Sequence, residues 1–304
     1  MFVINPEKYS VPAYRLGPFR TSDIAFNHKL NIDNTIDTYF SERFGGGIFY
    51  YTINGRSAID QALSSYSLKK TDVVTILTTS GNKYIAKCVT DEIEKTCQWN
   101  REIVPGTKVI LVNHEFGFIH PEMDKLITMG IPIIEDCCTT FFSQDHDKRV
   151  GKYGDFAVYS FPKIFPIQIG GLLVNNNKLI TAKSAIEPET LSYIKKVLSY
   201  HILQKDKLMD KRSFIYEYGI EKFRKIGFTQ RFDGNLYTVP YAILLNNHGI
   251  IKDLPALKSH LWKHGIQSSV FYGEDAFFLP SHQNLSETDV DYFVFVVNNF
   301  INHQ

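Results

Sequence analysis

The sequence predicts an α/β protein whose mostly parallel sheet is covered by helices on both faces. From about residue 47, short apolar runs alternate with amphipathic stretches that have helical spacing. The runs are apolar at consecutive positions, which is typical of strands buried on both faces of a parallel sheet. Since such sheets bind ligands beyond the carboxyl ends of their strands, we expect the functional residues at those ends.

The first expected unit is a strand, a tight turn and a helix. The strand covers 48–53, Asn54 and Gly55 form the turn, and apolar residues of the following helix recur at helical spacing from Ala58 to Tyr66. Apolar runs and amphipathic stretches then predict strand 73–77, helix 83–94, strand 108–113, helix 121–129, strand 131–136, and strands 156–161 and 170–175.

The composition changes after about residue 180. The stretch 187–226 is charged and helical, with no strand signal. A second αβ region follows, with strand 237–245, helix 254–263, a short strand near 269–272, and a final helix whose start at Ser286 and Asp289 resembles a capping box. We therefore expect a larger domain over 1–180 and a smaller C-terminal αβ domain over 181–304.

Length and charge limit the class of partner. At roughly 150 residues per domain, 304 residues suggest one large or two modest domains. The 33 Lys and Arg against 32 Asp and Glu give a net charge of +1, which disfavours nucleic-acid or membrane-surface binding and favours a small-molecule partner. No apolar run approaches the roughly 18 residues that span a bilayer, and the start has no leader pattern, so we expect a cytoplasmic protein.

Metal and disulfide patterns are weak. The cysteines form no C-x-x-C pair, and neighbouring Cys137 and Cys138 would make a strained disulfide, so we expect four buried, reduced thiols and no zinc site. His114-Glu115 with His120 lacks the spacing of a zinc helix. The Asp145-His146-Asp147 segment is typical of a solvated turn. The sequence predicts no metal site.

Polar residues follow three of the expected strands. Asn54-Gly-Arg-Ser57 is suited either to bind a phosphate at a helix start or to act as an ordinary N-cap. Glu135-Asp136 ends an apolar strand, where a carboxylate is functional, a surface charge or a helix cap. Ser160-Phe-Pro-Lys163 follows another strand. Desolvation there favours a neutral Lys163 amine, unless the side chain extends into solvent.

One cofactor requires this combination. Pyridoxal phosphate (PLP) needs a lysine for a Schiff base, a carboxylate that keeps the pyridine nitrogen protonated, and a phosphate site at a helix start. Lys163, Asp136 and the turn at Gly55 would supply these groups, and Ser160 would add a hydroxyl. The combination therefore predicts a PLP site.

A set of motifs around these residues occurs in a fixed order along the chain. It comprises Asn54-Gly-Arg-Ser-Ala-Ile-Asp-Gln-Ala-Leu63, Pro132-Ile-Ile-Glu-Asp136, Arg149-Val-Gly-Lys-Tyr-Gly-Asp155, Tyr159-Ser-Phe161, Gly170-Gly171 and Phe278-Leu-Pro-Ser-His-Gln-Asn-Leu-Ser-Glu-Thr-Asp-Val290. In content and order this set resembles the DegT/DnrJ/EryC1/StrS family of PLP-dependent sugar aminotransferases. Each motif is modest, whereas the ordered set is fairly specific.

The resemblance implies the type I aminotransferase fold, with a three-layer αβα large domain and a smaller C-terminal αβ domain. It implies that a homodimer transfers an amino group from an amino acid such as glutamate to a nucleotide-linked keto sugar, for amino-sugar or surface polysaccharide biosynthesis. Lys163 would be the Schiff-base lysine and Asp136 the partner of the pyridine nitrogen. The expected cofactor-binding residues are Gly55, Arg56, Ser57, Tyr84, Asp136, Thr139, Ser160 and Lys163.

Several features depart from the family pattern. Lys163 follows Ser160 by three residues instead of five, and Thr139 stands where Gln or His is common. Tyr84 is the nearest candidate for the aromatic that stacks on the ring, with Asn82 or Lys83 under a shifted alignment. The segment between about residues 174 and 191, which in the family reaches the partner's active site, is nearly absent, and the stretch 98–105 is abbreviated.

These departures motivate an alternative function. A protein that keeps the fold but has lost transamination would serve as a binding or regulatory subunit. A PLP-dependent sugar dehydratase is a third possibility, which Lys163 disfavours because the family's dehydratases replace that lysine.

Overall fold

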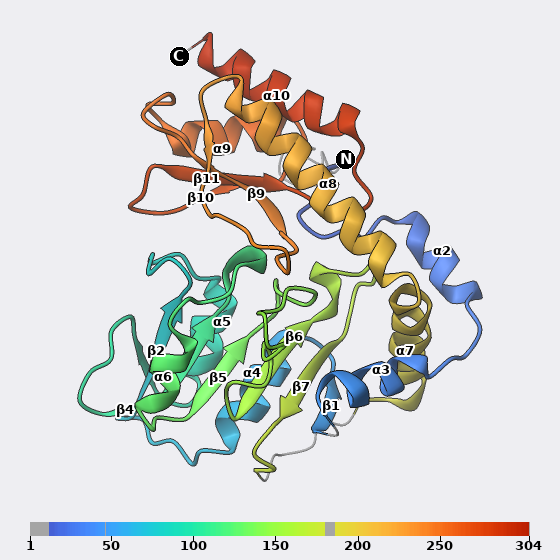
Figure 1. Ribbon diagram of the computed structural model, residues 1–304, viewed down its shortest axis with the longest axis vertical. Coiled ribbons are helices and arrows are strands. Elements are labelled where there is room, and N and C mark those ends of the chain that lie inside the picture. Colours follow the sequence, from blue (N-terminus) through green and yellow to red (C-terminus); the bar gives the residue numbers. More distant parts are fainter. Residues whose placement is uncertain (1–11, 46, 180–185, 304) are drawn as a thin grey trace, which may run out of the picture. The chain divides into compact units, whose positions relative to one another are not determined.

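The computed structural model describes residues 12–45, 47–179 and 186–303, which form two compact units (Figure 1). The larger unit comprises Phe19–Lys207 and Gly234–Val239, and the smaller comprises the described parts of Met1–Pro18, Leu208–Asp233 and Pro240–Gln304.

The predicted domain boundary at residues 180–181 lies outside the described residues. On its far side, helix α7 (Pro188–Ile202) packs on α3 (Thr35–Arg43) and α2 (Ser22–Lys29) within the larger unit. The compact units therefore divide at Leu208. The assignment of 1–180 and 181–304 to separate domains stays a prediction.

The larger unit contains a seven-stranded sheet in the order β1-β7-β6-β5-β4-β2-β3. Its strands are β1 (Ile48–Thr52), β2 (Val73–Thr78), β3 (Gln98–Asn100), β4 (Thr107–Asn113), β5 (Ile133–Asp136), β6 (Phe156–Ser160) and β7 (Gly171–Asn175). β7 is antiparallel to both of its neighbours, β6 and β1. The neighbouring pairs β6-β5, β5-β4, β4-β2 and β2-β3 are all parallel. The predicted mostly parallel α/β sheet is confirmed, with β3 as a short strand that the sequence did not predict.

Helices cover both faces of this sheet and form three layers (Figure 1). Helices α4 (Gly55–Ser64) and α5 (Lys87–Glu94) pack on one face, against a core that includes Val109 and Leu111 of β4. Helix α6 (Met123–Thr128) packs on the other face, against Ile110 and Val112. Alternate residues of β4 thus enter opposite cores, which explains why the strand is apolar at consecutive positions.

The smaller unit has a four-stranded antiparallel sheet in the order β10-β11-β9-β8. Its elements are α8 (Lys205–Arg224, whose first residues belong to the larger unit), β8 (Thr229–Gln230), β9 (Ala242–Asn246), α9 (Leu254–Lys263), β10 (Ser269–Val270), β11 (Ala276–Pro280) and α10 (Glu287–Ile301). The predicted capping box is present, because Ser286 and Asp289 exchange side-chain to backbone bonds. The predicted strand 237–245 begins only at Ala242, since residues 234–239 form a loop of the larger unit.

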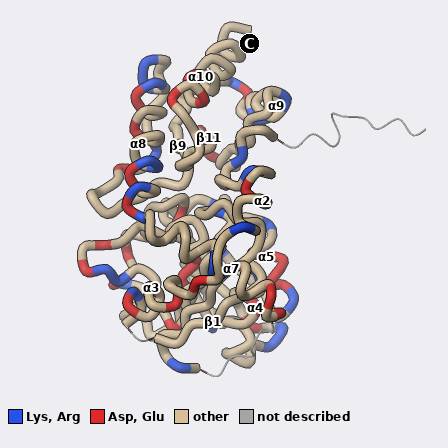
Figure 2. The backbone as a smooth tube through the Cα atoms, turned by 90° about the vertical axis from the view of Figure 1, so that its right-hand side faces the viewer, with Lys and Arg blue, Asp and Glu red and all other residues tan. Residues whose placement is uncertain are grey.

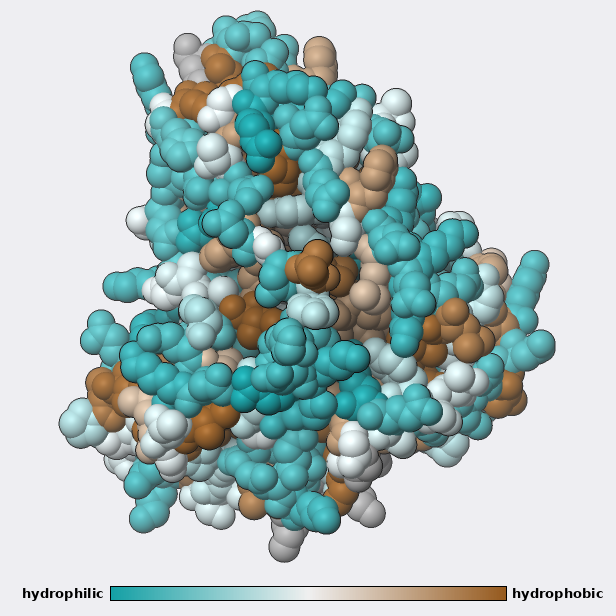
Figure 3. Space-filling model, viewed as in Figure 1, coloured by the Kyte–Doolittle hydropathy of each residue, from teal (hydrophilic) through white to brown (hydrophobic). Residues whose placement is uncertain are grey.

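The surface carries charges of both signs. Basic and acidic positions are interspersed along the visible backbone of each unit (Figure 2), in agreement with the net charge of +1. Apolar side chains on the face shown in Figure 3 occur as separate groups between hydrophilic ones. Within the described residues, no helix combines the length and the apolar character needed to cross a membrane.

Candidate active site

Three chain segments meet at the carboxyl edge of the sheet. A Cβ atom on Gly55, the first residue of α4, would lie 3.1 Å from Cys138 Sγ and 3.2 Å from Ser160 Cβ. The turn before α4, the end of β6 and the loop after β5 are therefore in direct contact. The structure thus brings together the three strand ends that the sequence singled out.

The turn at the start of α4 depends on two glycines of the β7 start. A Cβ on Gly171 would lie 2.7 Å from both Thr52 Oγ1 and the Tyr159 carbonyl oxygen, so only glycine fits there. Gly170 has a left-handed φ of +105°, and its N–H donates to the Ile53 carbonyl at 2.7 Å. These close approaches explain the Gly-Gly pair and fix the turn beside β6.

Asn54 acts as the N-cap of α4. Its Oδ1 accepts a hydrogen bond from the Ser57 backbone N–H at 3.0 Å and one from the Ser57 hydroxyl at 3.3 Å. The N-cap interpretation of this turn is therefore correct. The N–H groups of Gly55 and Arg56 lie in the first turn, where a helix supplies no acceptor. A phosphate would bind these two directly, whereas the predicted Ser57 amide contact requires Asn54 to release its bond.

Asp136 is the last residue of β5 and is only 2% exposed. Its Oδ1 accepts a hydrogen bond from the Cys138 N–H at 3.0 Å, and its Oδ2 accepts one from Asn113 Nδ2 at 2.8 Å. The Cys138 thiol is a third, weak donor to this carboxylate, whose two oxygens together accept up to four hydrogen bonds. The carboxylate is thus buried, oriented and able to bind a further N–H group.

Lys163 ends a single 3₁₀ turn, Phe161–Lys163, that directly follows β6. The side chain is half-buried. Burial, and then the neighbouring Asp136 carboxylate, raise the pKa of the Cys138 thiol well above its usual value, and the Lys163 ammonium partly offsets this rise. Lys163 and Asp136 therefore act electrostatically on the same thiol. Gly55 therefore packs against both Cys138 and Ser160, and Asp136 and Lys163 both act on the charge of the Cys138 thiol.

Thr139 and Tyr84 are held by contacts within the chain. The Thr139 hydroxyl accepts a hydrogen bond from the Phe116 N–H at 2.9 Å and donates one to the His114 carbonyl at 3.1 Å. Tyr84 is half-buried in the loop before α5, which begins at Lys87 and not at 83 as predicted. Its ring centroid lies 6.2 Å from that of Phe116. The roles of Thr139 and Tyr84 beside a cofactor stay predictions.

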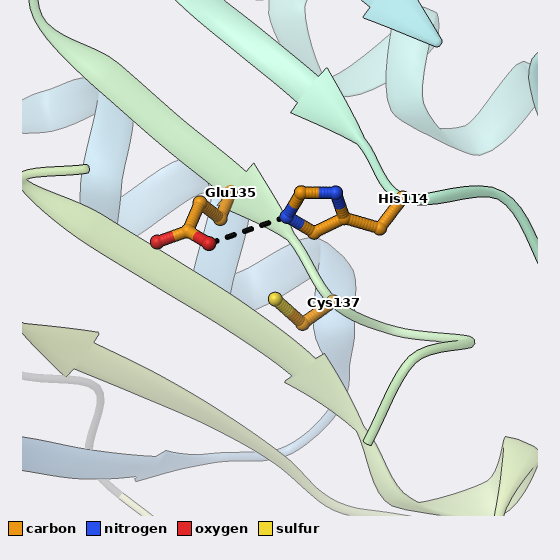
Figure 4. A group of neighbouring side chains, drawn as sticks. All are labelled: His114, Glu135 and Cys137. Atoms are coloured by element: carbon orange, nitrogen blue, oxygen red, sulfur yellow. Dashed lines mark hydrogen bonds and ion pairs between the residues drawn. The ribbon is translucent and has the colours of Figure 1, made fainter. Parts of the chain in front are cut away.

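His114, Glu135 and Cys137 form a second polar cluster (Figure 4). Because side chains alternate along a strand, Glu135 points to the opposite side of β5 from Asp136. One ligand-type atom from each residue falls within 4.8 Å of the others. His114 Nδ1 accepts from the His120 N–H at 3.1 Å, so Nε2 carries the ring proton and donates to Glu135 Oε2 at 3.2 Å. A neutral imidazole in this arrangement has no lone pair for a metal.

Glu135 fixes the segment that precedes β6. Its two oxygens accept hydrogen bonds from the backbone N–H groups of Gly151, Tyr153 and Gly154, at 2.9, 2.7 and 3.0 Å. With the His114 bond, this buried carboxylate accepts four hydrogen bonds. The cluster therefore has a structural role.

All four cysteines, which lie within the described residues, are free thiols. Cys97, Cys137 and Cys138 are buried as predicted, whereas Cys88 is exposed, because its position on α5 faces away from the core. The predicted absence of a Cys137–Cys138 disulfide has a physical reason. Cys137 faces Glu135 and Tyr159, and Cys138 faces Gly55, so the two thiols lie on opposite sides of the strand end.

Two residues of this site were missed by the sequence analysis. Asn113 is a polar residue that ends an apolar strand, the same signal that identified Asp136, and could have been found in that way. Cys138 gave no usable signal, because a cysteine within a buried segment is ordinary.

The fold is that of the PLP-dependent aminotransferases. Similar solved structures include the aminotransferase TlmJ from Streptoalloteichus hindustanus, with a TM-score of 0.71, 15% identity, and coverage of 91% of this chain and 93% of that one. A DegT DnrJ EryC1 StrS aminotransferase from Brucella abortus gives a TM-score of 0.69 at 14% identity, covering 92% and 93%. The PLP form of Spr1654 from Streptococcus pneumoniae, described as a sugar aminotransferase, gives a TM-score of 0.69 at 15% identity. The match covers 97% of this chain and 98% of that one.

The resemblance to the DegT/DnrJ/EryC1/StrS aminotransferase family is confirmed, because the family's model matches residues 95–201. That segment contains Asp136, Thr139, Ser160 and Lys163. A relative from Campylobacter jejuni subsp. jejuni serotype O:23/36 (strain 81-176), named UDP-4-amino-4,6-dideoxy-N-acetyl-beta-L-altrosamine transaminase, is 32% identical over 97 residues, which are 30% of this chain and 23% of the relative. The chain thus matches less than a quarter of that protein's length.

Proposed function

We propose that this protein is a PLP-dependent aminotransferase that transfers an amino group from an amino acid such as glutamate to a nucleotide-linked keto sugar. The observation that carries the proposal is that Gly55 packs against Ser160 and Cys138, while Asp136 and Lys163 both act electrostatically on the Cys138 thiol. Of the predicted site residues among these, Ser160, Asp136 and Lys163 lie in the segment that the aminotransferase family model matches.

The residues present fit the cofactor. Gly55 has no side chain at the point where a Cβ would press on Ser160 and Cys138, so the backbone of the helix start lies directly beside these two residues. The N–H groups of Gly55 and Arg56 and the Ser160 hydroxyl would bind the phosphate, aided by the dipole of α4. Asp136 would accept the N–H of the protonated pyridine ring, and Lys163 Nζ would hold the cofactor covalently. When bound, PLP supplies the electron sink that amino-group transfer needs.

Lys163 has a second role in this proposal. With the cofactor and an amino donor bound, the Lys163 amine would accept the proton of the substrate carbon and return it later. Asp136 would hold the protonated ring nitrogen by a hydrogen bond. Burial of Asp136 would strengthen this pairing, because electrostatic interactions are stronger where water is excluded.

The substrate class rests on the relatives. The Campylobacter protein is named for a UDP-linked amino sugar, which supports a nucleotide-linked keto sugar as the amino acceptor here. We further propose a homodimer and a role in amino-sugar or surface polysaccharide biosynthesis. Since the family segment that reaches the partner's site is nearly absent, closure of the site would involve other residues.

A second candidate function is a PLP-fold protein that binds ligands without transamination. Two observations favour it: the Thr139 hydroxyl is engaged with Phe116 and His114, and Asn54 occupies the Ser57 N–H that a phosphate would use. In this case the cofactor would bind, but an amino donor would not convert it.

Absorbance of the purified protein with PLP tests both functions. The aminotransferase proposal expects a visible band that borohydride fixes to the protein and that Lys163→Ala abolishes. It also expects conversion of the bound cofactor by glutamate or another amino acid. A stable visible band with no conversion by any amino donor would favour the binding protein, and a colourless protein that takes up no PLP would refute both.

A further inference from the structure

A polar side chain at the end of β4 faces the Asp136 carboxylate. The parallel register pairs Asn113 with Asp136, which places the two side chains on the same side of the sheet. Asn113 Nδ2 lies 2.8 Å from Asp136 Oδ2. Because an ionised carboxylate only accepts hydrogen bonds, the NH₂ end of the amide must face it.

The backbone around this contact is fixed by other bonds. The His114 N–H donates to the Asp136 carbonyl at 3.1 Å, and the hydroxyls of Thr139 and Thr140 both donate to the His114 carbonyl, at 3.1 and 2.9 Å. The pairing of the two strand ends therefore does not depend on the Asn113 amide. The Asn113 amide instead fixes the orientation of the Asp136 carboxylate.

The two N–H hydrogen bonds to Asp136 come from different directions. The Cys138 N–H holds Oδ1 and the Asn113 amide holds Oδ2, so rotation of the carboxylate about χ2 would break both bonds. The two oxygens together can accept up to four hydrogen bonds, and the Cys138 thiol is a third, weak donor to this carboxylate. Asn113 is half-buried, so it lies at the rim of this site and not within the core.

We propose that Asn113 is a positioning residue that sets the plane of the Asp136 carboxylate for a protonated ring nitrogen of the cofactor. This inference rests on the proposed function. Without the amide, the carboxylate can rotate and must be reoriented on binding, which weakens the bond to the cofactor.

The test is a double-mutant cycle with PLP as the probe. Asn113→Leu has a similar volume and removes the donor, and Asp136→Ala removes the group through which Asn113 is proposed to act. We expect N113L to weaken PLP binding roughly tenfold, the range for a hydrogen bond to a charged group, and to shift the absorbance of the bound cofactor and its pH dependence. In the D136A background, the same substitution should change the dissociation constant less than about twofold.

A matched control lies at the opposite edge of the same sheet. Asn175 is buried, and its side-chain amide exchanges hydrogen bonds with the backbone of Leu179. Asn175→Leu should lower the thermal midpoint while leaving the PLP dissociation constant and spectrum unchanged. If N113L does not fold, Asn113→Ala removes the same donor without added bulk and carries the same expectations.

The outcomes separate this inference from the proposed function. Wild-type affinity and spectrum in N113L, or an equal loss of affinity in the wild-type and D136A backgrounds, would overturn the role of Asn113 alone. Failure of the wild-type protein to bind PLP would overturn the proposed function, and this inference with it.

Discussion

Glu135 and Asp136 are adjacent acids at the end of one strand, and they differ in how many hydrogen bonds they accept. Both are buried, at 0% and 2% exposure, so burial does not distinguish them. Glu135 accepts four hydrogen bonds from its own chain. Asp136 accepts one from the Cys138 N–H, one from the Asn113 amide and a weak third from the Cys138 thiol. The comparison teaches that unused hydrogen-bonding capacity, and not burial, marks the carboxylate available to a ligand.

The largest expected effect is the loss of amino-group transfer when Lys163, which acts with Asp136 on the Cys138 thiol, is replaced. Lys163→Ala should reduce amino-group transfer by roughly 10²–10⁴-fold or more, because both the covalent link and the proton-transfer group are lost. The free energy of unfolding should change by less than about 0.5 kcal/mol, since Lys163 is half-buried at a loop edge. Transfer rates and urea denaturation measure the two effects. A K163A protein that keeps wild-type turnover would remove Lys163 from the mechanism.

Glu135→Ala tests whether Glu135, the acid with four hydrogen bonds, stabilises the fold. It leaves the N–H groups of Gly151, Tyr153 and Gly154 without their acceptor, and we expect a loss of about 3–5 kcal/mol in the free energy of unfolding. Asp136→Ala should cost less, about 1–2 kcal/mol, because only two N–H donors and one weak thiol donor lose their acceptor. Urea denaturation of both variants measures this. If D136A proved the more destabilised, the distinction between the two acids would be wrong.

The free energy of unfolding should depend on pH through His120, whose N–H donates to His114, the hydrogen-bond partner of Glu135. Burial lowers the pKa of His120 to about 4 from an ordinary value of 6.5, with the nearby His114 as a smaller cause. Between these two pKa values the unfolded chain binds more protons at this residue than the folded protein. The contribution of neutral His120 to the free energy of unfolding is therefore fully present above about pH 6.5 and falls as the pH drops towards 4. The loss amounts to about 3 kcal/mol.

Urea midpoints between pH 4 and 7 test this dependence. His120→Asn keeps an acceptor for the Glu122 N–H, which His120 Nδ1 accepts at 3.2 Å, and removes the titrating group. Its pH profile should be flatter than that of the wild type. Parallel profiles would show that other groups cause the acid destabilisation.

The smallest expected effect comes from Gly55→Ala. The φ of Gly55 is not left-handed, so the backbone accepts alanine, but the new Cβ would press on Cys138 and Ser160 at 3.1 and 3.2 Å. We expect PLP to bind roughly three- to tenfold more weakly. Adding Cys138→Ala removes Sγ and should restore part of the affinity. Equal affinities of G55A and the wild type would show that the helix start tolerates a side chain beside the site.

Much of the fold could be predicted from the sequence, because apolar runs separated by amphipathic stretches identify buried parallel strands. β3 was missed since it is three residues long and polar. The site was predicted in part: Asp136, Ser160 and Lys163 follow apolar runs. Sequence could not separate Asp136 from Glu135, because both end the same run and only the tertiary contacts decide which one receives the backbone donors. The contact of Thr139 with Phe116 likewise depends on how two loops meet.

The alternation of side chains along β5 makes the length of this strand critical. Glu135 with Cys137 and Asp136 with Cys138 differ only in the parity of their positions, so deletion of a single residue upstream in the strand would exchange the two faces. The acid that holds the backbone would then face the proposed cofactor, and the other would enter the core without enough donors. Loops of this protein can therefore change length at little cost, whereas β5 tolerates no change in residue count.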